Sequence, residues 1–420
     1  MDTNQSTLEP QTMHAPEGVQ DLPQTEAEAA MIQLLNPLGW YREMLATAPV
    51  RYDERSQIWH IFGYEDVQRV ITDHSTFSSD FSRLMSQEER AERPTQSSLI
   101  TVDPPFHRQL RGLVTQAFTP RAIAAMEPRI REIVNEQLDL VIASGQMDVI
   151  NDLSYPLPVI VIAEMLGVPS TDRADFKRWS DAVVAVDPND PELVNSQARR
   201  ETPPEFEEMT RYFTTMIEQR RQQPQDDLIS QLIVAQLDGR HLTHDELLGF
   251  CTLLLIAGNI TTTSLLSNAI WCFDEQPEAW AQLRTDPSLV PAAVEEVLRY
   301  RSPVKALFRI ASQDTEIGGQ PIKAGALLMP WIGAANHDPA QFVDPEHFDI
   351  TRAPNRHLAF GHGVHFCLGA PLARLEVRVA LEEMARRMET VRIAPDTQLE
   401  PLKSFMYGLK RLPVVFTPAL

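Results

Sequence analysis

Cysteine is scarce in this chain of 420 residues, which contains only Cys251, Cys272 and Cys367. Three cysteines so far apart predict neither a disulfide framework nor a zinc site with paired Cys-x-x-Cys ligands. The N-terminal segment is polar and acidic and lacks an apolar stretch, so no signal peptide is predicted. No uninterrupted apolar run of about 18 residues occurs, so no membrane span is predicted. These absences together predict a reduced, cytoplasmic protein.

Basic residues are also few, because 37 Lys and Arg stand against 58 Asp and Glu, and the formal net charge is -21. Proteins that bind nucleic acid need a basic field to displace counterions, so a nucleic-acid partner is not expected. Hydrophobic residues make up 43% of the chain and charged residues 23%, as in ordinary globular proteins. This composition excludes wholesale disorder and allows a large buried core.

Helical periodicity dominates the chain beyond residue 37. Helices are predicted over residues 120–144, 155–165, 171–184, 205–222, 226–237, 244–276 and 370–388. Strands are predicted within 50–62 and over 305–311, 315–317 and 326–331, with a small C-terminal strand pair. Residues 78–101 are interpreted as a long loop and 187–204 as a connector. The prediction is a mainly α fold with small β-sheets, with one domain over 36–420 after a loosely ordered arm at 1–35.

The predicted helix over 244–276 is apolar on nearly every face, which is typical of a helix buried all round. Midway along it come Gly258, Asn259, Ile260 and Thr261, followed by two further threonines. Glycine costs about 1 kcal/mol inside a helix, and threonine hydroxyls can bond the carbonyl four residues earlier and bend the helix. A locally unfavourable sequence inside an obligatory helix indicates a functional site.

The strongest signal is the glycine-rich run over residues 357–369, which surrounds Cys367 and leads into the last predicted helix. Glycines allow close backbone approach and positive φ angles. A thiolate at a helix N-terminus is stabilised by the helix dipole and by unpaired N–H donors. The run therefore predicts a thiolate that acts as a metal ligand or as a nucleophile.

Four interpretations of Cys367 compete. A lone cysteine is commonly a small buried hydrophobe. A zinc site that joins Cys367 to His357, His362 and His365 lacks the usual paired spacing. A cysteine hydrolase needs a distant histidine and a strand directly before the loop. A thiolate ligand to haem iron accounts for all the features together.

At fixed spacing, the run contains Phe360, Gly361, Gly363, His365, Cys367 and Gly369. This pattern resembles the haem-binding signature of the cytochrome P450 family, and the resemblance extends from about residue 36 to the C-terminus. It is closest to the soluble bacterial members. It implies haem b buried between the long helix and the Cys367 loop, with Cys367 as the iron ligand. It also implies haem contacts at Phe360, Gly361 and Gly369, and close approach of haem and O₂ to Ala257 and Gly258.

The resemblance further implies partners for the two haem propionates, which need cations or donors once they are buried. The matching positions are His107, Arg111, Arg309 and His365. It also implies a buried network in which Glu296 and Arg299 are joined by Arg352. Without the resemblance, each of these side chains is more simply a surface charge or a solvated pair.

Oxygen chemistry in the family depends on a threonine that matches Thr261, generally preceded by Asp or Glu. This chain has Ile260 at the preceding position. One hypothesis is that water organised by Thr261 and Asn259 carries the protons, with some leakage to peroxide. A second is that hydrogen peroxide is the oxidant, as in a peroxygenase. A third is a haem-binding protein without turnover.

The resemblance places a substrate pocket among apolar residues, which suits a lipophilic molecule such as a terpenoid, steroid, fatty acid or macrolide. The positions are Ile100, Leu253, Ile256, Val304, Ala306, Leu307, Phe405 and Met406. Plain core is as good an explanation for any one of them.

Electrons for a monooxygenase must come from outside this chain, since no G-x-G-x-x-G fingerprint follows a predicted strand. The resemblance implies a ferredoxin- or flavodoxin-type donor with its reductase. Arg108, Arg121 and Arg374 are predicted to form its docking patch, although solvated arginines are the simpler alternative. We expect a monomer.

Overall fold

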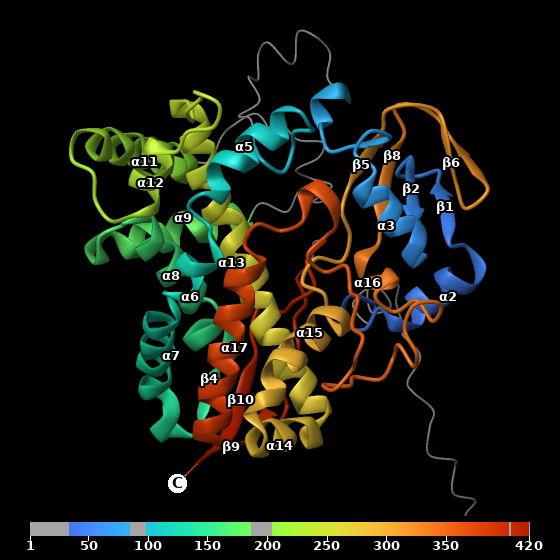
Figure 1. Cartoon of the computed structure of the whole chain (residues 1–420). Coiled ribbons are helices and arrows are strands. Elements are labelled where there is room, and N and C mark those ends of the chain that lie inside the picture. The colour runs from blue at the N-terminus through green and yellow to red at the C-terminus, as the bar shows by residue number, and fades with distance from the viewer. Residues whose placement is uncertain (1–32, 85–97, 186–203, 403–404, 420) are drawn as a thin grey trace, which may run out of the picture.

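The computed structural model describes residues 33–84, 98–185, 204–402 and 405–419. Nearly all of the predicted arm (1–35) and of the predicted connector (187–204) lies outside the described residues. A small mixed sheet with its covering helices forms one side of the molecule, and a helical body forms the other (Figure 1). Each side has its own hydrophobic core, of which the helical one is much the larger.

The α-helices of the described residues are α2 (Leu38–Thr47), α3 (Tyr64–Thr72), α5 (Phe106–Thr115), α6 (Pro120–Ala124), α7 (Glu127–Val141), α8 (Pro156–Leu166), α9 (Arg173–Ala185), α11 (Pro204–Gln222), α12 (Leu228–Val234), α13 (His244–Glu275), α14 (Pro277–Thr285), α15 (Val290–Tyr300), α16 (Ile332–Ala335) and α17 (Ala370–Arg387). Short 3-10 segments lie at Phe81–Leu84, Ile142–Ser144, Ser170–Asp172, Pro287–Leu289 and Gly363–His365, and a π-helical segment lies at Ile150–Ser154.

The strands form three sheets. The largest has the order β1 (Val50–Asp53), β2 (Ile58–Ile61), β8 (Leu327–Pro330), β5 (Arg309–Ala311) and β3 (Phe77–Ser78). The second has the order β4 (Gln146–Asp148), β10 (Pro413–Pro418) and β9 (Met388–Ile393), and the third pairs β6 (Thr315–Ile317) with β7 (Gln320–Ile322). The β2–β8 pair is parallel, with Trp59 opposite Leu328, and the other pairs are antiparallel.

Several predicted elements differ from the structure. The helix predicted over 120–144 is divided into α6 and α7, because Pro128 lies in the first turn of α7, where a missing N–H is tolerated. The strand predicted over 305–311 is reduced to β5, and β7 was not predicted. The segment 50–62 forms the β1–β2 hairpin, and the predicted loop over 78–101 contains a short 3-10 segment.

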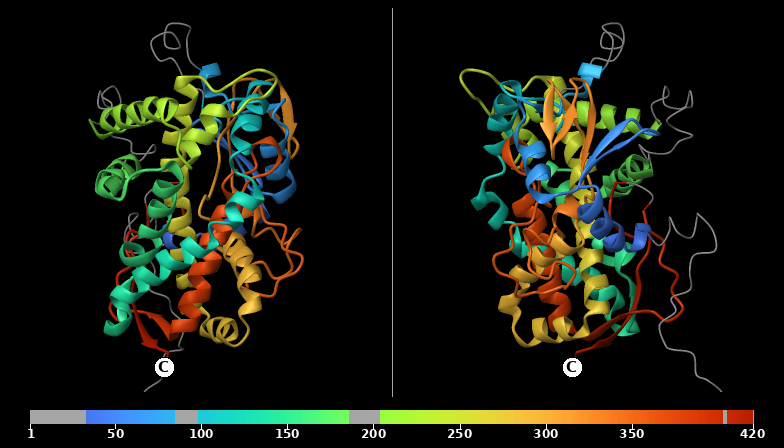
Figure 2. Two further views of the ribbon diagram at one scale, coloured as in Figure 1. Left: turned by 60° about the vertical axis from the view of Figure 1, so that its left-hand side comes forward. Right: turned by 90° about the vertical axis from the view of Figure 1, so that its right-hand side faces the viewer.

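Helix α13 runs through the helical body, where it packs against α8, α9, α11, α15 and α17 (Figure 2). Its N-terminus is fixed by a capping box, in which the Thr243 hydroxyl accepts from the Glu246 N–H and the Glu246 carboxylate accepts from the Thr243 N–H. By length and composition α13 is apolar enough to cross a membrane, but 61% of its most apolar window is buried inside the protein. It is therefore a core helix that α17 and the Cys367 loop approach from one side.

Candidate active site

The Cys367 loop is a tight turn that leads from the 3-10 segment Gly363–His365 into α17. The Cys367 N–H donates to the Phe360 carbonyl oxygen at 2.9 Å, which closes the turn. Gly361 and Gly363 have φ angles of 70° and 71°, a region that other residues rarely adopt. A Cβ atom at Gly363 would also lie 3.2 Å from the Thr72 Cα atom, so this position requires glycine.

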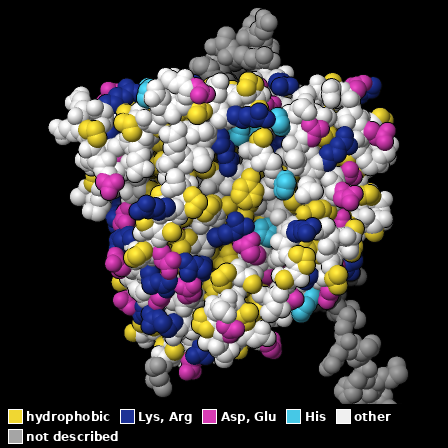
Figure 3. All heavy atoms as spheres, in the orientation of Figure 1, with side chains coloured by type: hydrophobic (Ala, Val, Ile, Leu, Met, Phe, Trp, Pro, Cys, Tyr) yellow, Lys and Arg dark blue, Asp and Glu magenta, His cyan; other side chains and the backbone are white. Residues whose placement is uncertain are grey.

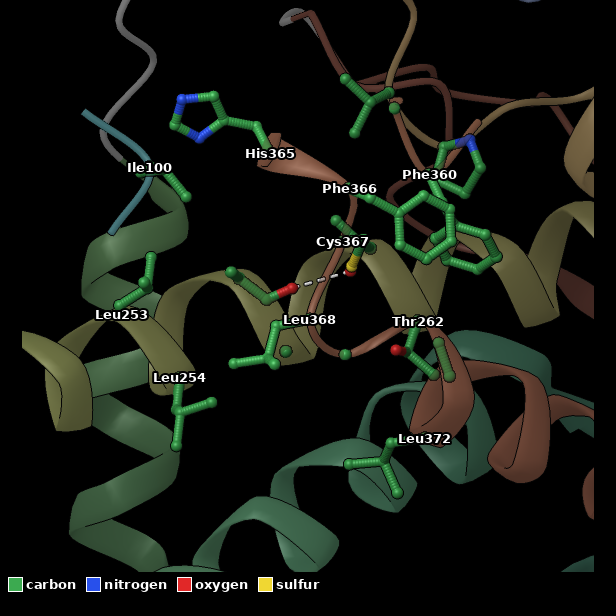
Figure 4. A pocket seen from close by; sticks show the side chains of 18 of the residues that line it. Ile100, Leu253, Leu254, Thr262, Phe360, His365, Phe366, Cys367, Leu368 and Leu372 are labelled. Atoms are coloured by element: carbon green, nitrogen blue, oxygen red, sulfur yellow. Dashed lines mark hydrogen bonds between the residues drawn. The ribbon is translucent and has the colours of Figure 1, made fainter. Parts of the chain in front are cut away.

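The side chain of Cys367 faces a cavity of about 1480 Å³, a volume that includes the part open to solvent. Its walls come from α5, α8, α13, the segment 303–307, the Cys367 loop and the start of α17. In Figure 4, Leu253, Leu254 and Thr262 contribute from α13, and Phe360 and Phe366 lie beside Cys367 in the loop. The cavity therefore joins a sulfur ligand to largely apolar walls.

Many of the residues predicted from the sequence meet at this cavity. Those that line it are Ile100, His107, Arg111, Leu253, Ala257, Gly258, Thr261, Val304, Leu307, Phe360, Gly361, His365, Cys367 and Gly369. Other predicted residues do not line it, namely Ile256, Asn259, Ile260, Ala306, Arg309, Phe405 and Met406. Ala306 and Met406 are instead buried core residues, and Met406 forms a β-bridge with Val304.

A pair of histidines forms the polar side of the cavity. His107 from α5 is 2% exposed, and its ring lies 4.4 Å from that of His365, centroid to centroid. Both ring nitrogens of His107 and Nε2 of His365 are buried without a hydrogen-bond partner among the described residues. Burial, followed by His365 and Arg111, lowers the pKa of His107 to about 4. Burial also lowers the pKa of Arg111, the next residue on the same face of α5.

Asp103 and Arg309 lie behind the histidine pair. Asp103 accepts hydrogen bonds from the Ser78 hydroxyl and, at 3.0 Å, from the Ser79 N–H, and lies 4.0 Å from His365 Nε2. Burial raises the pKa of Asp103, but the neighbouring His365 and the hydrogen bonds from Ser78 and Ser79 outweigh it and lower the pKa to about 2. Arg309 is buried and donates to the Phe308 carbonyl oxygen at 2.7 Å, and burial lowers its pKa to about 10.

The thiol itself is not ionised by the loop alone. Burial raises the pKa of Cys367, while the N–H groups of Gly369 and Ala370 and the charge of Arg111 act in the opposite direction. The sequence-based expectation of a dipole-stabilised thiolate thus gives the right direction for these groups but underestimates burial. A coordinated metal ion deprotonates its thiol, so ligation would supply the missing stabilisation.

Helix α13 presents its unusual sequence at the cavity. The Thr261 hydroxyl donates to the Ala257 carbonyl oxygen four residues earlier, at 2.7 Å. A Cβ atom at Gly258 would lie 3.1 Å from the Ile162 side chain of α8, so glycine also permits close helix packing. Asn259 is fully buried and Ile260 is partly buried. Because the residue before Thr261 is isoleucine, this position supplies no acid to the cavity.

The structure brings Glu296, Arg299 and Arg352 together. Glu296 and Arg299 are fully buried, with an Arg299 Nη2 to Glu296 Oε1 distance of 2.7 Å. Arg352 Nε donates to Glu296 Oε2 at 3.1 Å, and Asn355 adds a further donor at 3.1 Å. Arg299 also donates to three backbone carbonyls in the coil before the Cys367 loop, those of Asn336, Pro345 and His347. The network therefore ties α15 to the segment that positions the loop.

The geometry does not favour zinc. His357 is directed to Glu295, with Nε2 and Oε2 3.0 Å apart, and Glu295 also binds Arg374 at 2.7 Å. Among the described residues, no group of three or more His, Cys, Asp or Glu could hold a metal ion.

Sequence reasoning missed part of the cavity wall. The additional lining residues are Leu99, Phe118, Ile162, Phe250, Leu254, Thr262, Leu265, Leu298, Pro303, Ile332, Ala359, Phe366, Leu368, Leu372, Ala373 and Glu376. Most are apolar and indistinguishable from core in a sequence. Glu376 is the exception, because a helical step of seven from Gly369 places it on the cavity face of α17.

The family model described as Cytochrome P450 matches residues 52–416. The chain belongs to the cytochrome P450 family. Erythromycin C-12 hydroxylase from Saccharopolyspora erythraea is 42% identical over 90% of this chain and 94% of the hydroxylase. The crystal structure of substrate-free CYP109E1 from Bacillus megaterium superposes with a TM-score of 0.85, at 45% identity, and covers 92% of this chain and all of that one. The same P450 in complex with testosterone gives a TM-score of 0.81 at 44% identity, covering 90% and 99% of the two chains.

Family membership also gives the enzyme class, since relatives are named as hydroxylases and epoxidases: the protein is a cytochrome P450 monooxygenase. P450s carry a haem-thiolate cofactor, and the residues present fit it. Cys367 offers sulfur to the cavity, and buried nitrogens of His107 and His365 have no partner among the described residues, so they are available to an acidic group.

Proposed function

We propose that this P450 binds haem b through Cys367 and inserts one oxygen atom of O₂ into a lipophilic small molecule. The observation that carries the proposal is the cavity itself, where the one sulfur faces walls of apolar side chains and a buried cluster of donors lies to one side. When bound, haem supplies the activation of O₂, which the thiolate favours by donating electron density. The protein is proposed to be cytoplasmic and monomeric.

The residues proposed to hold haem form two groups, polar residues for the propionates and apolar residues for the faces of the ring. His107, Arg111 and His365 would bind the propionates as donors, and the buried Arg309 would complete their charge balance from the adjacent strand. The carboxylate of Asp103 lies 4.0 Å from His365 Nε2 and would hold that ring in orientation.

The two faces of the proposed haem ring need space more than they need charged partners. Phe360, Gly361 and Gly369 would bound the Cys367 face, and Ala257 and Gly258 would allow the opposite face to approach α13. All five line the cavity. None of these five side chains has a polar group, so they would keep water away from the ring faces.

Thr261 is proposed to hold and pass protons at Oγ1. Its hydroxyl donates to the Ala257 carbonyl, so the oxygen lone pairs remain directed toward other donors. Asn259 is buried behind the wall, so any part it plays in organising water would be through α13 rather than at the cavity surface. Haem-thiolate peroxygenase activity is the alternative, and turnover with hydrogen peroxide in the absence of a reductase would favour it.

The apolar side chains of the cavity wall indicate the class of substrate. Ile100, Leu253, Val304 and Leu307 line the cavity and are proposed to touch the substrate, whereas Ile256, Ala306, Phe405 and Met406 would shape the wall from behind. A steroid, terpenoid, fatty acid or macrolide fits such a surface. One relative is an erythromycin hydroxylase, and another was crystallised with testosterone.

Electrons are proposed to come from a ferredoxin- or flavodoxin-type protein that docks on the face carrying α17. On this face apolar side chains gather near the centre, with Lys and Arg side chains beside them (Figure 3). Arg108 and Arg121 are exposed. Arg374 is less available to a docking partner, because it donates two hydrogen bonds to Glu295, of 2.7 and 2.8 Å.

The test of the proposal is the absorbance of the reduced protein with carbon monoxide, compared with a Cys367→Ser variant. We expect a strongly red-shifted Soret band that the variant loses, since oxygen ligation does not reproduce the thiolate. A colourless protein, or a band that the substitution leaves unchanged, would remove Cys367 as the ligand. Substrate-dependent O₂ consumption then separates a monooxygenase from a haem-binding protein without turnover.

A further inference from the structure

His337 follows α16 and is buried against residues of α2 and α15. It is 5% exposed, and its ring lies 6.0 Å from that of Tyr41 in α2 and 5.5 Å from that of Tyr300 in α15, centroid to centroid. Its Nδ1 atom is 2.8 Å from the Gly333 carbonyl oxygen, which can only accept a hydrogen bond. Nδ1 therefore donates, and the neutral ring has its lone pair at Nε2.

The lone pair of His337 faces no hydrogen-bond donor. Nε2 of His337 and the Tyr41 hydroxyl are both buried without a hydrogen-bond partner among the described residues. Asp338, the next residue along the chain, is an acid, but its carboxylate accepts from the Tyr64 and Ala340 N–H groups at 2.8 and 2.9 Å. A proton added to Nε2 would therefore be buried without an acceptor in place.

The charged groups around His337 oppose a further positive charge. Burial, followed by Arg299, lowers the pKa of His337 to about 3. Arg301 and Arg352 act in the same direction, and the hydrogen bond to the backbone opposes them only in part. Glu296 cannot compensate for another cation, because Arg299 and Arg352 already bind its carboxylate. The site is therefore built for the neutral ring.

The residue before His337 holds the start of the Cys367 loop. Asn336 is fully buried, and its Oδ1 atom accepts from the Leu358 N–H at 2.7 Å. The Leu358 carbonyl oxygen accepts in turn from the Gly361 N–H at 2.8 Å, inside the run that leads to Cys367. A displacement of His337 would therefore pass through Asn336 to this loop.

We propose that His337 is a positioning residue for the Cys367 loop that acts only in its neutral form, so that acid releases the loop. One proton from water adds to Nε2, no electron is exchanged, and the imidazolium leaves its buried site. Asn336 moves with it, and the Leu358 N–H loses its acceptor. The spectroscopic part of the test rests on the haem ligation by Cys367 proposed above.

The first test measures how unfolding depends on pH. Because the pKa of His337 is about 3 in the folded protein and about 6.5 in the unfolded chain, stability is full above pH 6.5 and is lost as the pH falls towards 3. Between pH 7 and pH 5, the unfolding equilibrium constant of the wild-type holoenzyme should rise roughly 25-fold more than that of His337→Gln. Urea denaturation followed by circular dichroism measures both. Acid protonates the other groups in both proteins, so the difference reports on His337.

The matched control is His347→Gln, since the His347 side chain is exposed in the coil that follows α16. This variant should keep the wild-type dependence of unfolding on pH. His337→Phe is a second variant without a titrating group, and it decides the question if His337→Gln does not fold. An equal change in the exposed control would remove His337 as the cause.

The second test follows the loop through the spectrum of the reduced protein with carbon monoxide. On acidification, the wild type should lose its red-shifted Soret band while the helical circular dichroism signal is retained. His337→Gln should keep the band at pH values where the wild type has lost it. Asn336→Ala should weaken the band already at pH 7, because it removes the acceptor of the Leu358 N–H.

Two results would contradict the proposal: the same dependence of unfolding on pH in His337→Gln and the wild type, or loss of the band at the same pH in both. Loss of the band only together with the helical signal would show that His337 supports the whole fold and does not position the loop. If the wild type gives no red-shifted band at any pH, the proposed ligation by Cys367 fails, while the unfolding measurement still decides the state of His337.

Discussion

Glu296 shows how a single side chain can hold distant segments together at the residue scale. It accepts hydrogen bonds from Arg299 in its own helix, from Arg352, and from the Asp349 N–H at 2.9 Å. Two positive charges therefore share one buried negative charge. Removal of that charge leaves both arginines in a low-dielectric environment without compensation.

We expect Glu296→Gln to lower the free energy of unfolding by about 3–5 kcal/mol, because it breaks a buried network from one side only. Urea denaturation followed by circular dichroism measures the change. Glu207→Gln is the control, since its pair with Arg211 is 3.8 Å long and both side chains are mostly exposed. That exposed pair should change stability very little. Equal effects of the two substitutions would show that the network contributes no more than a surface pair.

Whether a residue lies at the cavity could be predicted from the sequence where it belongs to a motif of fixed spacing. It could not be predicted where the position depends on how the elements pack. Cys367 and Thr261 meet at the cavity as the glycine-rich run and the helix-breaking sequence indicate. Arg309 and Ile256 do not line it, because whether a residue at the end of a strand or on a helix flank faces a cavity depends on how the elements pack. Glu376 carried a signal, a helical step of seven from Gly369, but this signal points to the cavity only once the cavity face of α17 is known.

At the element scale, α13 depends on its first turn. Thr243 and Glu246 satisfy each other's backbone N–H groups, and Arg240 forms an ion pair with Glu246. The rest of the helix is held by burial, and the capping box lies about four turns before Thr261, although Phe250 of the cavity wall is only one turn from Glu246. Its contribution is therefore separable from the chemistry of the site.

We expect Thr243→Ala to lower the free energy of unfolding by about 1 kcal/mol, as is typical for the loss of a hydroxyl cap. Hydrogen exchange should report faster exchange at the Glu246 amide, whose acceptor is removed. Thr285→Ala, at the exposed end of α14, removes a hydroxyl that caps no helix N-terminus. If Thr285→Ala destabilises the protein as much as Thr243→Ala, the loss does not come from the cap.

The long elements were the most predictable. The expected helix over 244–276 differs from α13 by one residue at its end, because burial on all faces gives a continuous apolar pattern. Short strands were the least predictable, since β7 has only three residues and contains Pro321, which argues against a strand. Its pairing with β6 depends on the turn at Gly318 and Gly319, both with positive φ.

At the scale of the whole molecule, the net charge of -21 bears on how the protein would meet the ferredoxin- or flavodoxin-type donor proposed above, if that donor is also acidic. Overall repulsion must be offset by a local basic area, and Arg108 lies exposed on α5. We expect Arg108→Glu to slow reduction by a ferredoxin-type donor at low salt, with the difference disappearing at high salt. Stopped-flow reduction under carbon monoxide measures the rate.

The control for this experiment is Arg51→Glu, which makes the same charge change on β1 at the edge of the sheet. Both variants alter the net charge equally, so only a local docking effect distinguishes them. Equal slowing by the two substitutions would attribute the effect to net charge and remove Arg108 from the docking surface.

The parallel pairing of β2 with β8 has a consequence for biosynthesis. The β1–β2 hairpin ends at Ile61, whereas β8 begins at Leu327, so the hairpin leaves the ribosome long before its partner exists. At ordinary rates of translation that delay is on the order of tens of seconds. During this time the edge of β2 has unpaired N–H and C=O groups, which can pair with another nascent chain. The sheet therefore closes late, and we expect the β1–β2 hairpin to be most prone to pair with another chain in the interval before β8 is made.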